Sequence, residues 1–327
     1  MTSLPLIGVM IGDPAGIGPE VCVKAVASGE LAGLCRPVLI GDIGVLRRAA
    51  QVSGVSLAFE PVTSPNQDVA EGAVGVVDPG GFDVSSCPFG VASARSGDAV
   101  LEWIKTGDDL GKAGALQGLV MGPIDSASVK ATGKISDMDE LQPAHTFMLR
   151  MTGPLRVVPL TEHVPLSRAI ELVNPDSVFS LVELLDATLK SWGFARPRIA
   201  VAGINPHAMF DEDQQKIAPA VAFGRQRGID VSGPLVPDAV FRQTIEGKYD
   251  AVVTMFHDQG QIPVKTVGFA GACTVYIGLP YVMLNVPHGT AFDIAGKGVA
   301  QHLSMLSAMK TAARLASGQG IWVENND

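Results

Sequence analysis

Three histidines of this chain each stand just after a short apolar run: Leu155–Leu160 precedes His163, Ile199–Ala202 precedes His207, and Ala251–Phe256 precedes His257. If the runs are strands of one parallel sheet, the imidazoles lie at its carboxyl edge, where open α/β sheets bind ligands. Imidazole is the commonest metal ligand, and three protein ligands with one open position are typical of a catalytic metal site. The alternative is that each histidine only bonds a loop backbone, but the repeated context favours a shared metal site.

A second candidate site is the segment His288–Gly298, between an apolar run and the last predicted helix. The small residues Gly289 and Thr290 would let a flat ring lie against the backbone. Asp293 would accept hydrogen bonds from a ribose diol and repel a 2′-phosphate, which favours NAD over NADP. A structural loop is the alternative, although the length and composition of the segment are unusual for one.

Two further segments carry polar or glycine-rich patterns. Gly12–Glu20 directly follows the first predicted strand, and such a turn lets a ligand approach the backbone, so Gly12 and Asp13 are candidate cofactor contacts. The segment lacks the dinucleotide-binding spacing of glycines, so a structural tight turn is an equally good interpretation. Lys265, eight positions after His257, would pair with a carboxylate or phosphate or donate a proton to a developing oxyanion. A solvated loop with a surface salt bridge is the alternative there.

Composition bounds the class of protein. A chain of 327 residues is typical of two α/β domains, and 47% hydrophobic content is typical of a compact globular protein. The net charge of −9 argues against nucleic acid or an anionic membrane as the main partner. The cysteines form no metal-type or paired spacing, and we see neither a signal peptide nor an apolar run of membrane-spanning length. We therefore expect a cytoplasmic protein.

Apolar runs alternate with helix-like stretches, which predicts βαβ units and a mostly parallel sheet. Besides the runs before the histidines, we expect strands at Leu6–Ile11, Pro37–Ile40 and Gly118–Met121, and helices at Val21–Ala27, Ile43–Gln51, Ala92–Lys105, Asp176–Trp192, Gln215–Arg227 and His302–Ser317. The segment Glu60–Phe89 is rich in Pro, Gly, Ser and Asp, and it predicts an irregular excursion with short strands.

The segments with candidate chemistry resemble, in this order, the 4-hydroxythreonine-4-phosphate dehydrogenase family of vitamin B6 synthesis. The matching stretches span nearly the whole chain: Gly12–Glu20, Gly122–Ile124, Ala144–Thr146, His163–Leu166, Asn205–Ala208, His257–Lys265, Gly278–Pro280 and His288–Gly298. The last stretch is also similar to the adenosine-binding loop of isopropylmalate and isocitrate dehydrogenases. The resemblance implies a two-domain α/β fold of that type, with mostly parallel sheets and an interdomain cleft. We expect residues 1–140 with 286–327 to form the cofactor-side domain, and residues 141–285 to form the metal, substrate and dimerisation domain.

The resemblance also implies an activity and its residues. It implies a homodimer with a shared active site, in which a divalent metal is held by His163, His207 and the His257 of the other subunit. It implies substrate contacts at His145, Thr146 and Lys265, and it places Asp238 in the same site. Asp238 and His145 are the candidate proton acceptors, and Lys265 is the candidate proton donor. The implied reaction is NAD-dependent oxidation of an alcohol beta to a carboxylate, followed by decarboxylation. Nitrogen ligation favours Zn, with Co or Ni also preferred over Mg, and Mn is a further option.

Departures from the family pattern bear on the substrate. By our alignment Thr274 and Met283 stand where the family holds its phosphate with Asn and Arg, and Phe147 follows the His-Thr pair in place of Glu. A thioether cannot replace the bidentate guanidinium that phosphate recognition favours. We therefore expect a non-phosphorylated carboxylate such as an aromatic-acid cis-dihydrodiol, with these candidate pocket walls: Phe147, Met209, Phe210 and Met283.

Three alternatives stay open. The first is the family's own substrate, with the phosphate site rebuilt from other cations such as Lys130, Lys134 or Arg168. The second is a three-histidine metal hydrolase acting through a metal-bound water. The third is a small-molecule binder without catalysis. A ribose-binding acid in the His288–Gly298 loop is of no use to a hydrolase, so that loop discriminates against the second alternative.

Overall fold

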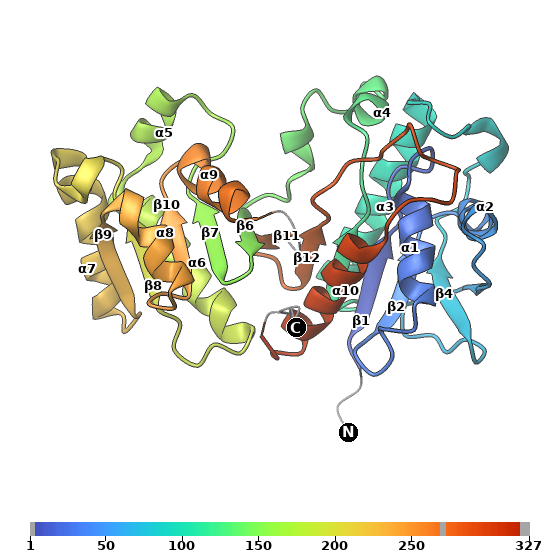
Figure 1. Ribbon diagram of the computed structural model, residues 1–327, viewed down its shortest axis with the longest axis horizontal. Coiled ribbons are helices and arrows are strands. Elements are labelled where there is room, and N and C mark those ends of the chain that lie inside the picture. The colour runs from blue at the N-terminus through green and yellow to red at the C-terminus, as the bar shows by residue number, and fades with distance from the viewer. Residues whose placement is uncertain (1–3, 269–272, 321–327) are drawn as a thin grey trace. The chain divides into compact units, whose positions relative to one another are not determined.

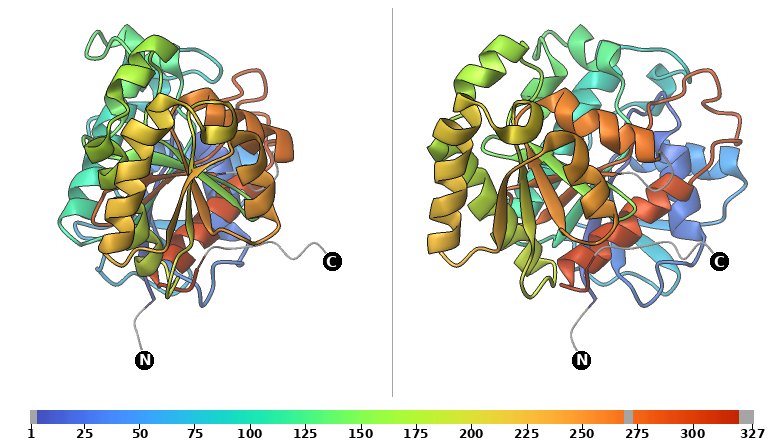
Figure 2. Two further views of the ribbon diagram at one scale, coloured as in Figure 1. Left: turned by 90° about the vertical axis from the view of Figure 1, so that its left-hand side faces the viewer. Right: turned by 60° about the vertical axis from the view of Figure 1, so that its left-hand side comes forward.

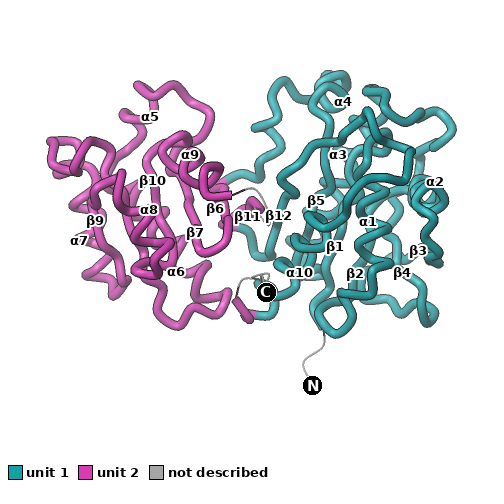
Figure 3. Tube along the Cα trace, in the orientation of Figure 1, with its two compact units in different colours: residues 1–144, 279–317 teal, residues 145–278, 318–327 magenta. Residues whose placement is uncertain are grey.

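The computed structural model describes residues 4–268 and 273–320, which divide into two compact units. Unit 1 comprises Met1–Ala144 with Leu279–Ser317, and unit 2 comprises His145–Gly278 with the residues from Gly318 onward (Figure 3). The predicted boundaries at residues 140 and 286 lie a few positions from the observed ones. Of the C-terminal residues that we placed in the first domain, residues 321–327 lie outside the described part of the chain.

Unit 1 is built on a parallel sheet in the order β3-β4-β2-β1-β5-β12 (Figures 1 and 3). Its strands are β1 (Leu6–Met10), β2 (Arg36–Ile40), β3 (Ala58–Pro61), β4 (Ala73–Val77), β5 (Gly118–Met121) and β12 (Val282–Asn285). Its helices are α1 (Gly18–Ala27), α2 (Ile43–Ser53), α3 (Ala94–Lys112), α4 (Ser126–Ala131) and α10 (Leu303–Ala316), with short 3-10 turns at Val84–Ser86 and Met138–Leu141. Helix α1 packs beside α2 and α10, and α3 packs on β1, β2 and β5.

Unit 2 has the strand order β11-β6-β7-β10-β8-β9. Its strands are β6 (Phe147–Thr152), β7 (Leu155–Pro159), β8 (Ile199–Ala202), β9 (Val231–Leu235), β10 (Ala251–Thr254) and β11 (Cys273–Ile277). The pairs from β7 to β9 are parallel, whereas β11, β6 and β7 pair antiparallel. Its helices are α5 (Leu166–Leu172), α6 (Pro175–Ser191), α7 (Ala218–Gln226), α8 (Pro237–Ile245) and α9 (His257–Val267), and η3 (Pro206–Ala208) and η4 (Asp213–Ile217) are single turns.

Helices cover both faces of the unit 2 sheet. Helices α6 and α7 pack on one face, and α8 and α9 pack on the other (Figure 2). The face below α8 and α9 buries a continuous apolar cluster: Leu155, Val157, Ala200, Ala202, Val240, Tyr249, Val252 and Val264. Strands buried on both faces are typical of parallel α/β sheets, and they explain why the runs before the histidines are uniformly apolar.

The three apolar runs that precede the histidines are neighbouring parallel strands. Strand β10 pairs with β7 on one side and with β8 on the other. Parallel strands share one carboxyl edge, so the segments that carry His163, His207 and His257 leave the sheet at the same edge. The predicted α/β fold with mostly parallel strands is confirmed.

One domain assignment was wrong, and one helix was not predicted. Strand β12 pairs parallel with β5, and it therefore lies in unit 1, although we placed its residues in the second domain. The segment His257–Lys265 is the larger part of helix α9, despite Gly260 and Pro263 within it. A Cβ on Gly260 would lie 2.9 Å from Val157 Cγ1, so glycine is required for the helix to approach the sheet.

No helix among residues 4–268 and 273–320 is both long and apolar enough to cross a membrane.

Candidate functional site

Side-chain hydrogen bonds tie the carboxyl ends of the three neighbouring strands together. Thr161 Oγ1, just beyond β7, donates to the carbonyl of Met255, just beyond β10, at 2.9 Å. The Gln259 amide accepts from the Met255 N–H and donates to the carbonyl of Gly203, the residue after β8, both at 2.7 Å. These contacts fix where the chain leaves each strand, and they bring the residues that follow β7 and β10 to one place.

Two of the three predicted metal ligands meet there. The ring centroids of His163 and His257 lie 5.1 Å apart in one chain. Together with Glu162 they offer two imidazole nitrogens and a carboxylate oxygen that all lie within 4.8 Å of one another. The two residues meet within a single chain. That the His257 of a second subunit serves as the ligand stays a prediction.

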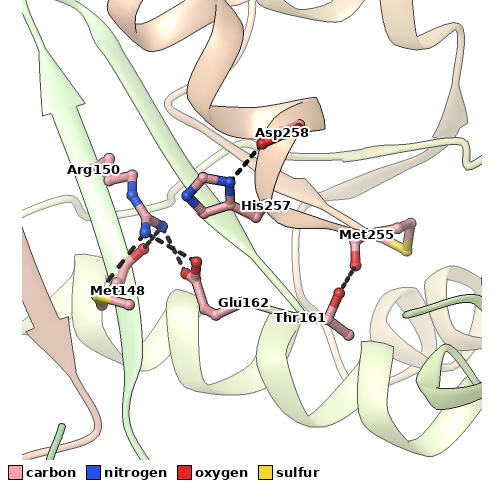
Figure 4. A network of polar contacts seen from close by, with 7 residues as sticks. All are labelled: Met148, Arg150, Thr161, Glu162, Met255, His257 and Asp258. Carbon is pink, nitrogen blue, oxygen red and sulfur yellow. Dashed lines mark hydrogen bonds and ion pairs between the residues drawn. The ribbon is translucent and has the colours of Figure 1, made fainter. Parts of the chain in front are cut away.

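Glu162 was missed by the sequence analysis. Its carboxylate forms a bidentate ion pair with Arg150 of β6, with Nη1–Oε1 at 2.6 Å and Nη2–Oε2 at 2.9 Å (Figure 4). The side chain of Arg150 is 6% exposed and that of Glu162 is 17% exposed, so water screens this pair little. The only signal in the sequence was a carboxylate directly beside a predicted ligand.

His257 is oriented by its neighbour in the chain. Its Nδ1 lies 2.7 Å from Oδ1 of Asp258, in the first turn of α9. The other ring nitrogen points away from Asp258, toward the side on which Glu162 and Arg150 lie (Figure 4). Histidines that bind metals commonly engage a carboxylate through the second nitrogen, which fixes the tautomer and the ring orientation. The contact with Asp258 thus leaves Nε2 of His257 available as a ligand.

The donor set fits a divalent cation. Two histidines and one glutamate are a known ligand set of catalytic zinc, with bonds of about 2.1 Å. Tetrahedral ligands at that bond length lie roughly 3.4 Å apart. The observed spacing of up to 4.8 Å therefore needs only a modest closure around the ion. Glu162, His163 and His257 are the residues that would hold the cation.

His207 does not belong to this group, and its role as a ligand stays a prediction. It is exposed on η3 with a φ of 59°, and Ala208 beside it has a φ of 54°. The buried carboxylate of Asp213 holds this connection by accepting the N–H groups of Ile204 at 2.7 Å and Phe210 at 3.3 Å. Left-handed backbone at residues other than glycine is strained and clusters at functional sites, which supports a functional role for the segment.

The predicted substrate contacts in unit 2 lie on four different elements. His145, with a φ of 61°, is exposed just before β6, and Thr146 beside it is buried. Asp238 is exposed in the first turn of α8, and Lys265 is exposed in the last turn of α9. Thr274 of β11 lies directly opposite Arg150 in the antiparallel register. Their roles toward a substrate stay predictions.

Met283 does not line an open pocket, contrary to our expectation. Its side chain is fully buried in unit 1, with Sδ 3.8 Å from the hydroxyl of Tyr281. That hydroxyl donates to Asp108 of α3 at 2.7 Å. The parallel pairing of β12 with β5 determines this placement, and it fixes Met283 in the core of unit 1.

The predicted cofactor residues all lie in unit 1. The two segments that carry them, Gly12–Glu20 and His288–Gly298, contact each other there. Gly12 has a φ of 79°, and a Cβ there would lie 2.6 Å from the carbonyl oxygen of Pro123. The N–H of Ile17 donates to the carbonyl of Thr290 at 2.9 Å. Thr290 itself is buried, whereas Gly289 and Asp293 are exposed. Of the residues expected to contact a ring and a ribose, the His288–Gly298 loop therefore exposes Gly289 and Asp293 but buries Thr290.

Asp13 is fully buried, so it shapes the turn and has no surface to offer a ligand in this structure. Its Oδ1 accepts the N–H of Ala15 at 2.8 Å. Burial raises the pKa of the Asp13 carboxyl to about 6, an effect that the hydrogen bond from Ala15 opposes. The prediction of a direct cofactor contact is thus not supported for Asp13.

The His288–Gly298 loop is anchored at its far end by a pair that sequence analysis did not predict. Lys24 Nζ on α1 donates to Glu20 at 2.8 Å, to the carbonyl of Gly298 at 2.9 Å and to the carbonyl of Ala300 at 2.8 Å. Oε1 of Glu20 also accepts the N–H of Ala300 at 2.9 Å. The two side chains thus tie the end of the loop to helix α1, which begins at Gly18 within the Gly12–Glu20 segment.

Comparison with known proteins identifies the family. The profile of the pyridoxal phosphate biosynthetic protein PdxA matches residues 33–312. This chain belongs to the PdxA family. A Novosphingobium aromaticivorans protein with the provisional name 4-hydroxythreonine-4-phosphate dehydrogenase is 44% identical over 97% of this chain and 96% of its own length. A D-threonate 4-phosphate dehydrogenase from Cupriavidus necator is 38% identical over 96% of this chain and 98% of its own length.

Solved structures of PdxA proteins share the fold. A 4-hydroxythreonine-4-phosphate dehydrogenase from Burkholderia phymatum has a TM-score of 0.85 at 37% identity, covering 96% of this chain and 99% of its own. A terephthalate 1,2-cis-dihydrodiol dehydrogenase from Burkholderia xenovorans has a TM-score of 0.74 at 28% identity, covering 98% and 99%. The family resemblance and the dehydrogenase class are confirmed. Our expectation of a non-phosphorylated dihydrodiol is not supported, because the more similar relatives are named for phosphorylated substrates.

Proposed function

We propose that this PdxA protein is an NAD- and divalent-metal-dependent dehydrogenase for a phosphorylated hydroxy acid of the 4-hydroxythreonine 4-phosphate or D-threonate 4-phosphate type. The observation that carries the proposal is the cluster of Glu162, His163 and His257 at the carboxyl edge of the unit 2 sheet. The names of the relatives support the phosphorylated substrate. Loss of carbon dioxide after oxidation is part of the proposal.

A bound cation would act as a Lewis acid on the substrate hydroxyl and promote departure of hydride to the nicotinamide. The chain's own residues prepare this chemistry. Asp258 fixes the tautomer of His257, and Arg150 holds the carboxylate of Glu162 beside the imidazoles. Asp238 is the candidate acceptor of the hydroxyl proton, and His145 is the second candidate.

Lys265 supports recognition of an anionic substrate. It is exposed in the last turn of α9, the helix whose first residue is His257. An ammonium group there would pair with a phosphate or carboxylate of a substrate bound at the metal site. Two cations considered as substitutes already have acidic partners, since Lys134 binds Asp98 at 2.9 Å and Arg168 binds Glu171 at 2.7 Å. Lys265, on the same helix as His257, is our principal candidate for the charged contact, and Lys130 is the remaining alternative.

The exposed residues of the His288–Gly298 loop support NAD as the cofactor. Apart from its two chain neighbours, no atom of the described residues lies within 4 Å of a Cβ added to Gly289, so the backbone there is open to a flat ring. Asp293 is exposed and would accept the ribose hydroxyls while repelling a 2′-phosphate. A metal hydrolase would have no use for these features, and the dehydrogenase names of the relatives also disfavour it.

The test is NADH formation by the purified protein with 4-phosphohydroxythreonine or D-threonate 4-phosphate. We expect turnover that is lost on chelation, restored by added Zn²⁺ or Mn²⁺, and reduced by at least about a hundredfold in His163→Ala, because this change removes a metal ligand. Turnover that survives both exhaustive chelation and His163→Ala would refute metal dependence. If NADH forms with neither compound, the proposed reaction is refuted.

A further inference from the structure

Arg150 is a buried cation that needs an explanation. It is 5% exposed on β6, and it donates to both oxygens of Glu162 and to the carbonyl of Met148 at 3.2 Å. Burying an ion pair costs desolvation that the attraction between the two charges often fails to recover, so such a pair is weak evidence for a role in stability. Here the carboxylate of the pair is also one of the three groups suited to a cation.

The charges around Glu162 decide how a cation would bind. Neutral imidazoles add no charge, so the carboxylate of Glu162 and the guanidinium of Arg150 cancel each other, and Asp258 beside His257 adds one negative charge to the cation-free site. A dication entering beside His163 and His257 would face the positive charge of Arg150 with little screening by water. The bidentate hydrogen bonds also withdraw electron density from the two oxygens that would serve as ligands.

A carboxylate has about four acceptor positions, of which Arg150 occupies one on each oxygen. Glu162 can therefore reach a cation, but its affinity for the cation is lowered as long as the guanidinium stays bound. We propose that Glu162 is a ligand of the divalent cation and that Arg150 competes with the cation for it. The ion pair holds the carboxylate in place in the cation-free chain and sets how tightly the cation binds. This inference rests on the proposed metal site, which it deepens.

The proposal predicts opposite effects for the two partners. Glu162→Gln removes a charged ligand and should weaken Zn²⁺ binding roughly tenfold or more. Arg150→Met leaves the carboxylate without its competitor and should tighten Zn²⁺ binding by a similar factor. A pair that only supports the local structure predicts weaker binding in both variants, because both would disorder the site.

The measurement is the Zn²⁺ affinity of the metal-free protein in competition with a chromophoric chelator. The Co²⁺ absorption spectrum provides a second readout, since loss of an oxygen ligand in Glu162→Gln should shift the visible bands. Arg242→Met and Glu246→Gln are matched controls, because they break an exposed pair of the same residue types and should change neither readout. Arg150→Lys retains the charge with fewer hydrogen bonds, so it should give a smaller tightening, and it replaces Arg150→Met if that variant fails to fold.

Weaker binding in the Arg150 variants would overturn the competition. Unchanged Zn²⁺ affinity and an unchanged Co²⁺ spectrum in Glu162→Gln would overturn the assignment of Glu162 as a ligand. These outcomes do not depend on the proposed reaction. Opposite shifts in affinity without turnover of a phosphorylated substrate would refute the proposed function and leave the competition standing.

Discussion

At the scale of single residues, the candidate chemistry of the metal site depends on side chains that orient other side chains. Asp258 orients His257, and Arg150 orients Glu162. Neither arrangement has a periodic signature in the sequence, because the first is a contact between adjacent residues and the second joins β6 to the segment that follows β7. The histidines themselves were predictable from their position after apolar runs, whereas Glu162 was not, since an acidic residue in a loop is ordinarily solvated.

Asp13 gives a prediction about pH. Its pKa is raised from 3.8 to about 6 by burial, so the folded protein favours the neutral carboxyl. This group contributes no penalty below pH 4, and ionising it above pH 6 costs the folded state about 3 kcal/mol. The free energy of unfolding of the wild-type protein should therefore fall by about that amount, relative to Asp13→Asn, between pH 4 and pH 7. Urea unfolding at several pH values measures this difference, and parallel curves for the two proteins would contradict it.

At the scale of elements, the anchoring of the His288–Gly298 loop to α1 can be tested through Lys24. Lys24→Met leaves the carboxylate of Glu20, which is 3% exposed, without its cation and removes two hydrogen bonds to the loop end. We expect a loss of about 3 kcal/mol in the free energy of unfolding, together with a higher KM for NAD.

The control is Lys105→Met, which breaks an exposed pair with Asp109 at the same i,i+4 spacing on α3. It should cost less than about 0.5 kcal/mol and leave the KM for NAD unchanged. Equal losses of stability in the two variants would show that Lys24 has no anchoring role.

Replacing two glycines of unit 1 with alanine should have contrasting effects on stability and on the KM for NAD. A Cβ on Gly16 would lie 2.8 Å from Cβ and 3.0 Å from the carbonyl oxygen of Thr290, so Gly16→Ala should cost about 1–3 kcal/mol of stability. Gly289 has open space at that position, so Gly289→Ala should change stability by less than about 0.5 kcal/mol. Its methyl group would instead occupy the space proposed for the cofactor ring and raise the KM for NAD. Thermal unfolding and NAD titration check both expectations, and an unchanged KM in Gly289→Ala would argue against cofactor binding at this loop.

At the scale of the whole molecule, exposed apolar side chains support the expected homodimer. Leu166 on α5 is 54% exposed, Met209 and Phe210 after η3 are 64% and 52% exposed, and Ile262 on α9 is 63% exposed. Their segments follow β7, β8 and β10 respectively, so they leave the sheet at the same carboxyl edge as the histidines. Exposed apolar side chains that form one patch are typical of an interface, so we propose that these residues contribute to the dimer contact.

We predict that the protein is a dimer in light scattering after size-exclusion chromatography and that Ile262→Asp weakens the dimer at least about tenfold, because it places a charge in an apolar contact. Leu303→Asp, which changes a similarly exposed residue in unit 1, is the control and should leave the dimer intact. A monomeric wild-type protein would contradict the expected shared active site.

Elements whose structure depends on their own residues were predicted from the sequence, whereas elements whose structure depends on distant partners were not. Ile199–Ala202 and Gly118–Met121 were predicted at their observed bounds because a buried parallel strand is a short, wholly apolar run. Helix α9 was not predicted, since Gly260 and Pro263 disfavour a helix locally while packing against β7 and β10 favours it. Met283 was assigned to the wrong unit because the partner of β12 is β5, far away in the sequence.

The central claim is that a PdxA protein with Thr274 and Met283 at the aligned phosphate positions still oxidises a phosphorylated hydroxy acid. The most direct measurement is kcat/KM for NADH formation on 4-phosphohydroxythreonine and D-threonate 4-phosphate, compared with their dephosphorylated forms and an aromatic cis-dihydrodiol carboxylate. We predict at least about a hundredfold preference for a phosphorylated compound, because losing a charged contact costs roughly 3 kcal/mol. Equal or better turnover of the cis-dihydrodiol would contradict the account.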